Sequence, residues 1–576
     1  MSWARRGVAA AVATPVSVVG VHALATLQAA WVGPSVAGAA GFLVLPFLLG
    51  GLIAWATGSA TTVVLGALVA FAGLALIGVL PWGFVFIVAI GAVLLAALAV
   101  RVAGMLPHSV DQAWSRARGR SIAWSVLALL MVLQVTRLSA FMADSDNAWG
   151  STFPPIEFTI GHMCMASYVH AADLARHDAE NVYSPEHYPS FGQTSANDIH
   201  TTIDGIQSYF DDAFLYAPAF LLLPRAWLAV SNDYRNIRTV WFAVQFLAFV
   251  AFAVFLARWV GGATGAWALW LFPLVLASMP TMFNFQFGQA HALTIWTAVA
   301  AMVAFDSKRP ALGGALLAWG IASKIFPGVL GLYLLLQRRW LDLAWTFGFT
   351  VLLVAFSVVV VGTGPALQFT EYMLPRLASG EAFSFITDEL PIVTNLSVPG
   401  SVWKLDFFGA QDGGAWLGVA SWAYTAFLVV AVWIAARFEG HPTGGPSNTD
   451  PAHAIVPGRQ SAGGEKGHAV AGGATHGGPD RARKAQIWLA ILILASLRSP
   501  IVPIYGALPI LWLMTLEFDR VRTTLGVVGF IASWILINGL PPAPEPRATI
   551  VMVAVTQVAI LYWVIRPLRW SRAAAT

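Results

Sequence analysis

Charge is scarce in this sequence: Asp, Glu, Lys and Arg make up 10% of the 576 residues, whereas 58% are hydrophobic. A soluble domain needs more polar surface than this composition can supply, so a soluble protein is excluded. Apolar runs of about 20 residues recur along the chain, and that is the length of a helix that spans a bilayer. The composition therefore predicts an all-α polytopic membrane protein with about 12–15 transmembrane or re-entrant helices.

Cysteine is nearly absent as well. The single cysteine, Cys164, can form no disulfide within the chain, and one cysteine does not by itself predict a metal site or a nucleophile. The sequence also has no Gly-rich nucleotide-binding loop, no HExxH pair and no Cys/His cluster, so no cofactor is required by a motif. An extracytoplasmic site without nucleotide must use energy stored in its substrate or in a gradient.

Basic residues do not form the extended patch that nucleic acid would need. The net charge is +4, but the Lys and Arg residues fall in short clusters between apolar runs, where they act as topology signals. Under the positive-inside rule, these clusters place the helix predicted at 121–143 so that it leads outward. The sequence therefore predicts a multi-pass plasma-membrane protein, with no nucleic-acid partner.

The largest polar segment follows that helix, at residues 143–212. It holds eleven of the 28 acidic residues and five of the 12 histidines, but its only basic residue is Arg176. Such a loop is too long for a simple turn, and loops of this kind usually carry function. We expect it to fold over the extracytoplasmic face of the membrane body.

Composition shifts divide the chain into four regions. Residues 438–484 are rich in Gly, Pro, Ser, His and charge and are predicted to be a disordered cytoplasmic linker. The expected regions are a four-helix membrane extension at 1–105, a core module at 106–437 that contains the loop 143–212, the linker at 438–484, and membrane helices at 485–576.

One apolar stretch carries a lysine in its middle. Residues 310–340 have basic residues at both ends and Lys324 three positions before Pro327. Two half-helices that meet near Lys324 satisfy these charges better than one straight helix, and broken helices are tolerated where they line a polar cavity. The charges also require that one of two Pro-containing runs, 213–230 or 264–282, does not cross; the sequence does not decide which.

Three kinds of side chain could carry chemistry. Asp144 and Asp146 follow the helix end directly, with Glu157 a short way on, and a carboxylate there could take the proton of a sugar hydroxyl. Lys324 is a cation deep in an apolar setting, where burial is costly and usually functional. Arg498, at a proline corner, could grip a lipid phosphate. The alternatives are solvated acids, a snorkelling lysine and an interfacial anchor.

Six short segments then show a resemblance to the GT-C class of polyprenyl-phosphate-sugar-dependent glycosyltransferases. Within that class the chain most resembles glycosyltransferase family 87, which contains bacterial mannosyltransferases that build phosphatidylinositol mannosides. In order, the segments are SYVHAADLARHDAENVY, FLYAPAFLLLP, FGQAHAL, SKIFPGVLGLYLLLQRRW, TNLSVPG and LRSPIVPIY.

The resemblance implies transfer of a sugar, most often mannose, from a polyprenyl monophosphate to an extracytoplasmic lipid or glycan acceptor, with inversion. It implies a loop acid as base, and the order of preference is Asp146, Asp144, Glu157. The position ahead of Tyr168 that the family fills with an acid holds Met163, Cys164 and Met165 here. The implied ligands of phosphate and sugar are Lys324, Arg498, Gln289, His291 and Asn395, with Tyr216 beside the groove.

Two other classes of protein remain as alternatives. A transporter or lipid-linked-sugar flippase would use Lys324 and the broken helices as a midplane site, but it predicts an inverted repeat, which is not seen. A non-catalytic subunit of a glycan assembly complex would fit if the loop acids faced bulk water. Two nearby carboxylates could hold a divalent ion, so the metal dependence stays open. The sequence also does not identify the acceptor, the sugar or the oligomeric state.

Overall fold

The chain is all-α in a computed structural model, as the composition predicts. The residues that the structure describes are 134–135, 137–139, 141–146, 148–152, 160–188, 201–209, 212–379, 381–383, 389–410, 413–439, 478–521, 523–538 and 545–569. Within them no strand forms, and an isolated bridge joins Asp204 and Asp233. The four helices expected at 1–105, Glu157 and linker residues 440–477 lie outside the described residues.

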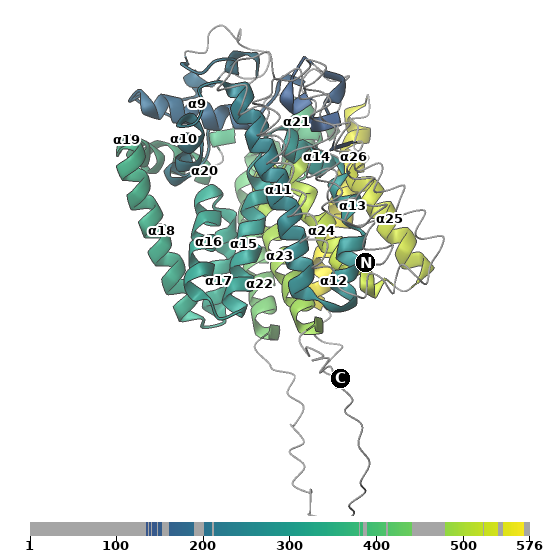
Figure 1. Ribbon diagram of the computed structural model, residues 1–576. Coiled ribbons are helices and arrows are strands. Elements are labelled where there is room, and N and C mark those ends of the chain that lie inside the picture. Colours follow the sequence, from purple (N-terminus) through teal and green to yellow (C-terminus); the bar gives the residue numbers. More distant parts are fainter. Residues whose placement is uncertain are drawn as a thin grey trace, which may run out of the picture.

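Four of the described helices are long and apolar enough to span a membrane, or five if one bent pair counts as a span. Figure 1 shows the long helices running in roughly the same direction through the body of the molecule. The four are α11 (Tyr234–Val260), α18 (Trp340–Val361), α22 (Leu417–Glu439) with the turn before it, and α26 (Pro546–Arg569).

The predicted break at Lys324 is confirmed. Helix α16 (Pro310–Ser323) ends there, and the chain resumes as a 3-10 turn, η8 (Phe326–Gly328), and α17 (Val329–Leu336). Lys324 itself is extended, with φ −152° and ψ 138°. Pro327 has no N–H to donate to the Ser323 carbonyl four residues back, and its ring would clash with that carbonyl, so one continuous helix cannot run through this point.

Neither of the two undecided apolar runs forms a single spanning helix. The run 213–230 holds only a 3-10 turn, η7 (Pro218–Leu221), and α10 (Leu222–Leu228). The run 264–282 is divided among α12 (Gly262–Trp270), α13 (Phe272–Leu276) and α14 (Met279–Gln286). A proline stands in the first turn of η7, α13 and α14, where its fixed φ suits a helix start.

A sharp corner joins α14 to α15 (His291–Asp306), whose axes differ by 106°. Gly288 sits in this corner with φ +63°, a left-handed conformation that costs other residues energy. A Cβ on Gly288 would also lie 2.7 Å from the Cβ of Met165. The glycine thus allows the corner to approach the extramembrane segment closely.

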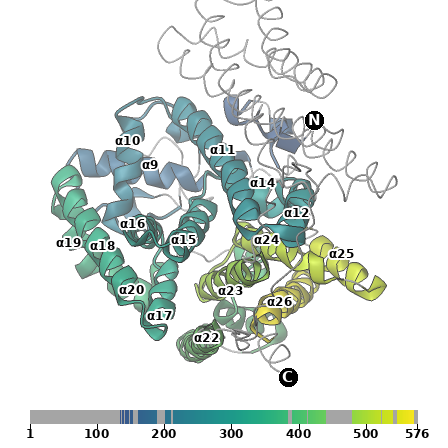
Figure 2. The same cartoon turned by 60° about the horizontal axis from the view of Figure 1, so that its bottom comes forward.

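The helices pack into one body with a shared apolar core. Helices α15, α16 and α18 lie side by side, and Gly314 of α16 lets the backbone of α18 approach at Trp345. Helices α23 (Gly478–Ser496) and α24 (Leu508–Glu517) pack against each other, and both contact α11 and α15. Figure 2 shows α11, α15, α23 and α24 near the centre, with α25 (Thr524–Asn538) at the periphery.

Part of the loop 143–212 forms a layer across one end of these helices. Its main element is α9 (Cys164–Arg176), which lies near α10 at the top of Figure 1. Asp173 of α9 holds the later part of the loop, because its carboxylate accepts hydrogen bonds from the Thr202 backbone N–H and from both the Thr201 and Thr202 hydroxyls. These bonds lower the pKa of Asp173, although burial acts in the opposite direction.

Candidate active site

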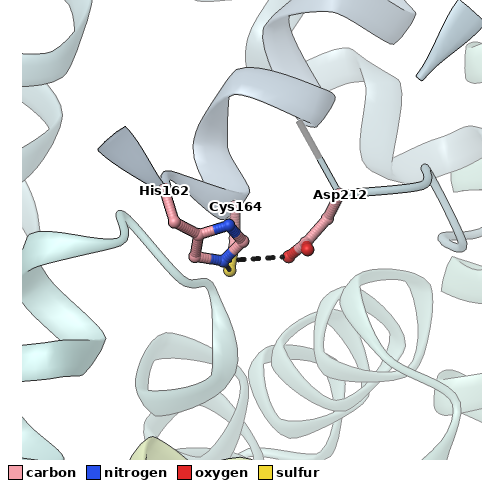
Figure 3. Close-up of side chains that lie close together, drawn as sticks. All are labelled: His162, Cys164 and Asp212. Carbon is pink, nitrogen blue, oxygen red and sulfur yellow. Dashed lines mark hydrogen bonds and ion pairs between the residues drawn. The ribbon is translucent and has the colours of Figure 1, made fainter. Parts of the chain in front are cut away.

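Two segments of the loop bring three different polar side chains together. His162 and Cys164 stand at the start of α9, and Asp212 comes from the chain that leads into η7 (Figure 3). The backbone N–H of Met165 donates to the carbonyl oxygen of Phe287 at 3.0 Å, which fixes the start of α9 on the α14–α15 corner. The cluster therefore lies where the extramembrane layer meets the membrane helices.

The three side chains form a closed group. His162 Nε2 lies 3.3 Å from Asp212 Oδ2 and 3.4 Å from Cys164 Sγ. His162 also packs edge-on against Phe287, with ring centroids 4.9 Å apart. The side chain of His162 is 8% exposed, whereas that of Asp212 is 37% exposed. The carboxylate is thus the member of the group that a substrate can reach.

Asp212 is held in its ionised form. Its surroundings act to raise the pKa of the carboxyl by desolvation, but His162, Cys164 and Lys324 together bring this pKa below its ordinary value. Burial and the neighbouring Asp212 raise the pKa of the Cys164 thiol, so the thiol stays protonated. Asp212 consequently carries a negative charge close to the positive charge of Lys324.

Lys324 faces this cluster from the broken helix. Its Nζ lies 5.4 Å from the centroid of the Tyr216 ring, a cation–π contact. Residues 212 and 216 belong to the same stretch of chain, so the carboxylate and the ring approach the lysine together. The extended conformation at Lys324 interrupts the helix at the point where the cation meets the loop.

Tyr216 also belongs to a network centred on Gln289. The Tyr168 hydroxyl donates to Gln289 Oε1 at 2.6 Å, and the Tyr216 hydroxyl lies 3.0 Å from the same oxygen and 2.7 Å from the Tyr168 hydroxyl. Gln289 Nε2 donates to the Tyr505 hydroxyl at 3.0 Å. Gln289 is 2% exposed. Its side-chain amide is therefore used to hold the hydroxyls of Tyr168, Tyr216 and Tyr505.

His291 begins α15 next to this network. It is 5% exposed, and its ring lies 5.4 Å from that of Phe326 and 6.2 Å from that of Tyr505. Its Nε2 has no hydrogen-bond partner among the residues that the structure describes. A buried ring nitrogen without a partner is costly, so it is suited to meeting a polar group of a ligand.

Asn395 has a different environment from the one expected of a sugar ligand. Its Nδ2 donates to the Pro500 carbonyl at 2.8 Å, and its Oδ1 accepts from the backbone N–H groups of Ser397 and Val502, both at 2.9 Å. The Lys404 ammonium donates to the Asn395 carbonyl. These bonds join the loop of Asn395 to the proline corner that precedes Tyr505.

Arg498 stands at the same proline corner but on its exposed side. Its Nε donates to Thr425 Oγ1 of α22 at 2.8 Å. The contact leaves the rest of the guanidinium available at the rim of the corner.

The loop acids predicted as the base lie elsewhere in the extramembrane layer. Asp144 and Asp146 are both exposed, and the Asp146 backbone N–H donates to Asp144 Oδ1 at 3.1 Å in a turn after the helix end. The third candidate, Glu157, is outside the described residues. The acid that the structure places beside Lys324 is Asp212.

Asp212 was not among the sequence-predicted site residues, although it ends the acidic loop. The sequence shows His162 and Cys164 two positions apart, which is a ligand-like spacing, but the third member follows 48 residues after Cys164. Only the fold of the loop places Asp212 next to His162 and Cys164. A usable signal was an acid at the junction between the polar loop and the next apolar run.

Comparison with known proteins gives one family. Residues 214–447, less than half of the chain, match the family model of glycosyltransferase family 87. The match includes Tyr216, Gln289, His291, Lys324 and Asn395, and it ends before Arg498 and begins just after Asp212. Neither the curated proteins nor the solved structures contain a match to the chain. The family match, together with the spanning helices, indicates a membrane glycosyltransferase.

Proposed function

We propose that this protein transfers a sugar, with mannose as the first candidate, from a polyprenyl-phosphate carrier to a lipid or glycan acceptor. We place it in the plasma membrane with its reaction centre on the extracytoplasmic face. The observation that carries the proposal is the pairing of a reachable carboxylate, Asp212, with a cation at a helix break, Lys324, beside a region that matches a glycosyltransferase family.

The reaction needs a base for the acceptor hydroxyl and a cation for the leaving phosphate, and Asp212 and Lys324 fit these two roles. The acceptor oxygen attacks the anomeric carbon of the sugar, the bond from that carbon to the phosphate oxygen breaks, and the polyprenyl phosphate leaves with the electron pair. The proton of the acceptor hydroxyl passes to the Asp212 carboxylate. Lys324 neutralises the charge that develops on the leaving phosphate, which is the larger electrostatic demand.

Other side chains fit supporting roles. The Tyr216 ring holds Lys324 by its cation–π contact, and the unpartnered Nε2 of His291 can meet a sugar hydroxyl or a phosphate oxygen. Arg498, exposed at the proline corner, is placed to meet the carrier or acceptor lipid rather than the reacting atoms. Asp146 and Asp144 are retained as competing candidates for the base.

A transfer assay separates these assignments. Purified full-length protein in lipid nanodiscs is given a panel of radiolabelled polyprenyl-phosphate hexoses and a lipid extract as acceptor. The variants are Asp212→Asn, Asp144→Asn and Asp146→Asn, with Asp178→Asn as matched control. Asp178 is exposed in the same loop with φ 53°, a conformation that Asn tolerates.

Loss of a general base costs about 10²–10⁴-fold in rate, so Asp212→Asn should transfer sugar far more slowly than wild type and Asp178→Asn. A comparable loss in Asp146→Asn or Asp144→Asn, with Asp212→Asn active, would move the base to those acids. Movement of the intact carrier between leaflets by wild type, without sugar transfer, would favour the flippase alternative.

A further inference from the structure

The cluster of His162, Cys164 and Asp212 has a second property that its part in sugar transfer does not require. The three residues offer a nitrogen, a sulfur and an oxygen, and these candidate ligand atoms all lie within 4.8 Å of one another (Figure 3). They come from two chain segments, the start of α9, which is bonded to the Phe287 carbonyl through the Met165 N–H, and the chain that enters η7. A group of this kind differs from an acidic cluster, because it combines three ligand types.

Two of the three separations between the candidate ligand atoms match the edges of a metal coordination tetrahedron, and the third, from Cys164 Sγ to the Asp212 carboxylate, is no more than 4.8 Å. Bond lengths to zinc are about 2.0–2.1 Å for nitrogen, 2.3 Å for sulfur and 2.0–2.2 Å for oxygen, so a regular tetrahedron separates N from S by ~3.5 Å and N from O by ~3.4 Å. The observed separations are 3.4 Å from His162 Nε2 to Cys164 Sγ and 3.3 Å from Nε2 to Asp212 Oδ2.

The same ring nitrogen, His162 Nε2, makes both close contacts. Without a metal, these contacts and a hydrogen bond between the Cys164 thiol and the Asp212 carboxylate hold the three side chains together. A cation between the three atoms would contact all of them at once. His162 is buried and Cys164 is 1% exposed, so each contact lies in a setting where unsatisfied polar atoms are costly.

The ligand set also selects the kind of ion. Thiolate and imidazole suit zinc and related transition metals, whereas magnesium and calcium prefer oxygen ligands. Three protein ligands with one further coordination position are typical of zinc sites that meet a substrate or water. A doubly charged ion with one thiolate and one carboxylate forms a neutral unit, which is compatible with the nearby Lys324 cation.

We propose that His162, Cys164 and Asp212 bind one zinc ion, through Nε2, Sγ and Oδ2, with the fourth coordination position left to an oxygen ligand. Binding displaces one proton, that of the Cys164 thiol. Ligation through Oδ2 leaves the second carboxylate oxygen of Asp212 for the acceptor proton, so the site is compatible with the proposed sugar transfer. The inference does not depend on that transfer, because it concerns metal binding alone.

The test measures metal binding without any sugar substrate. Full-length protein in detergent is freed of metal with a chelator and titrated with Zn²⁺ alone, and bound metal is quantified by mass spectrometry after desalting. We expect about one ion per chain. A parallel titration with Co²⁺ should give a thiolate-to-cobalt charge-transfer band and the intense visible absorption of a tetrahedral site. Wild type that binds neither ion would overturn the proposal.

Variants then assign the ligands. Loss of a residue that only hydrogen-bonds to a metal ligand typically weakens metal binding about 10–100-fold, so Cys164→Ser, His162→Gln and Asp212→Asn should each weaken Zn²⁺ binding by more than that range. Cys164→Ser should also abolish the charge-transfer band. The matched controls are His177→Gln, at a histidine whose side chain is 53% exposed, and Asp178→Asn. Unchanged binding in all three ligand variants would show an adventitious ion elsewhere and overturn the proposal.

Misfolding is separated from ligand loss by two further readings. Each variant is checked for folding by size-exclusion chromatography and circular dichroism. The Co²⁺ spectrum of the wild-type protein tests for the tetrahedral site by itself, so it does not depend on the folding of any variant. The metal titration contains no sugar donor, so its result is independent of sugar transfer. A protein that binds zinc but transfers no sugar would support the zinc site and count against the proposed function. A protein that transfers sugar but binds no zinc would support the proposed function and overturn the zinc site.

Discussion

Lys324 Nζ lies 5.4 Å from the centroid of the Tyr216 ring, on the chain segment that also carries Asp212. A lysine at a helix break thus meets, in one place, an aromatic face and a carboxylate. Such a cation is more useful to a phosphate than one already satisfied in a short ion pair, because a cation–π contact leaves its N–H donors free to bind oxygen.

Replacing Lys324 by Met should therefore reduce sugar transfer about 10²–10³-fold, because removal of one group that stabilises developing charge has this magnitude. Lys324→Arg restores the charge but not the compact ammonium, and it should recover only part of the rate. Transfer by purified protein is measured under saturating carrier. The control is Lys308→Asn, which removes an exposed cation at φ 57°, a conformation open to Asn. Wild-type transfer in Lys324→Met would remove the lysine from the reaction.

Gly288→Ala should destabilise the protein and disturb the site together. The substitution places a residue with a Cβ at φ +63°, 2.7 Å from the Met165 Cβ, and left-handed backbone costs about 1–2 kcal/mol even without a clash. Loss of the close approach would also shift Gln289. Thermal unfolding in detergent should fall by several degrees.

The matched control is Gly328→Ala, where φ is −55° and an added Cβ meets nothing within 4 Å. This change should leave the unfolding temperature unchanged or slightly raised, since alanine restricts the unfolded chain. Equal effects of the two substitutions would mean that the α14–α15 corner tolerates a side chain.

The helix break and the helical fold could be predicted from the sequence, because each depends on neighbouring residues. The break at Lys324 follows from basic residues at both ends of a 30-residue apolar stretch and from Pro327, and each of these acts on its own neighbours. The helical character of the fold follows in the same way from hydropathy. The division of 264–282 into three short helices was not predicted, although Pro273 and Pro280 marked two of the starts.

The site was predicted in part, because its members are joined by tertiary contacts. Lys324 was named as a cation in an apolar stretch, and Gln289 and Tyr216 were named from the family resemblance; the structure places Tyr216 against both of the other residues. Asp212 was missed because proximity to Lys324 depends on the path of a loop, which residue spacing does not encode. Asn395 was expected at the sugar, but its amide is used to hold the proline corner.

Asn395→Leu should consequently act on stability as well as on transfer. It leaves the backbone N–H groups of Ser397 and Val502 and the Pro500 carbonyl without their partner, at about 1–3 kcal/mol for each buried group left unsatisfied. The variant should unfold at a lower temperature, and any activity loss should track the folded fraction. Thr394→Val, one residue away and on an exposed hydrogen bond, is the control. Loss of carrier affinity at unchanged stability would instead support a direct role at the sugar.

His170 gives the protein a predictable response to acid. It lies on α9 outside the spanning helices, 1% exposed, with its Nε2 directed to the His187 carbonyl and with Asp173 and His187 as its charged neighbours. Burial lowers the pKa of His170 to about 4, whereas an unfolded chain has a histidine pKa of about 6.5. Above pH 6.5 His170 is neutral in both the folded and the unfolded state, so its protonation does not lower the free energy of unfolding.

Between pH 6.5 and 4 the unfolded chain binds a proton that the folded protein excludes, so the free energy of unfolding decreases as the pH falls. The full difference corresponds to about 3 kcal/mol at pH 4. His170→Gln should flatten this part of the stability profile, measured as unfolding temperature against pH in detergent, while His177→Gln at an exposed position should keep the wild-type slope. A wild-type slope in His170→Gln would show that other groups cause the acid sensitivity, because glutamine cannot titrate in this range.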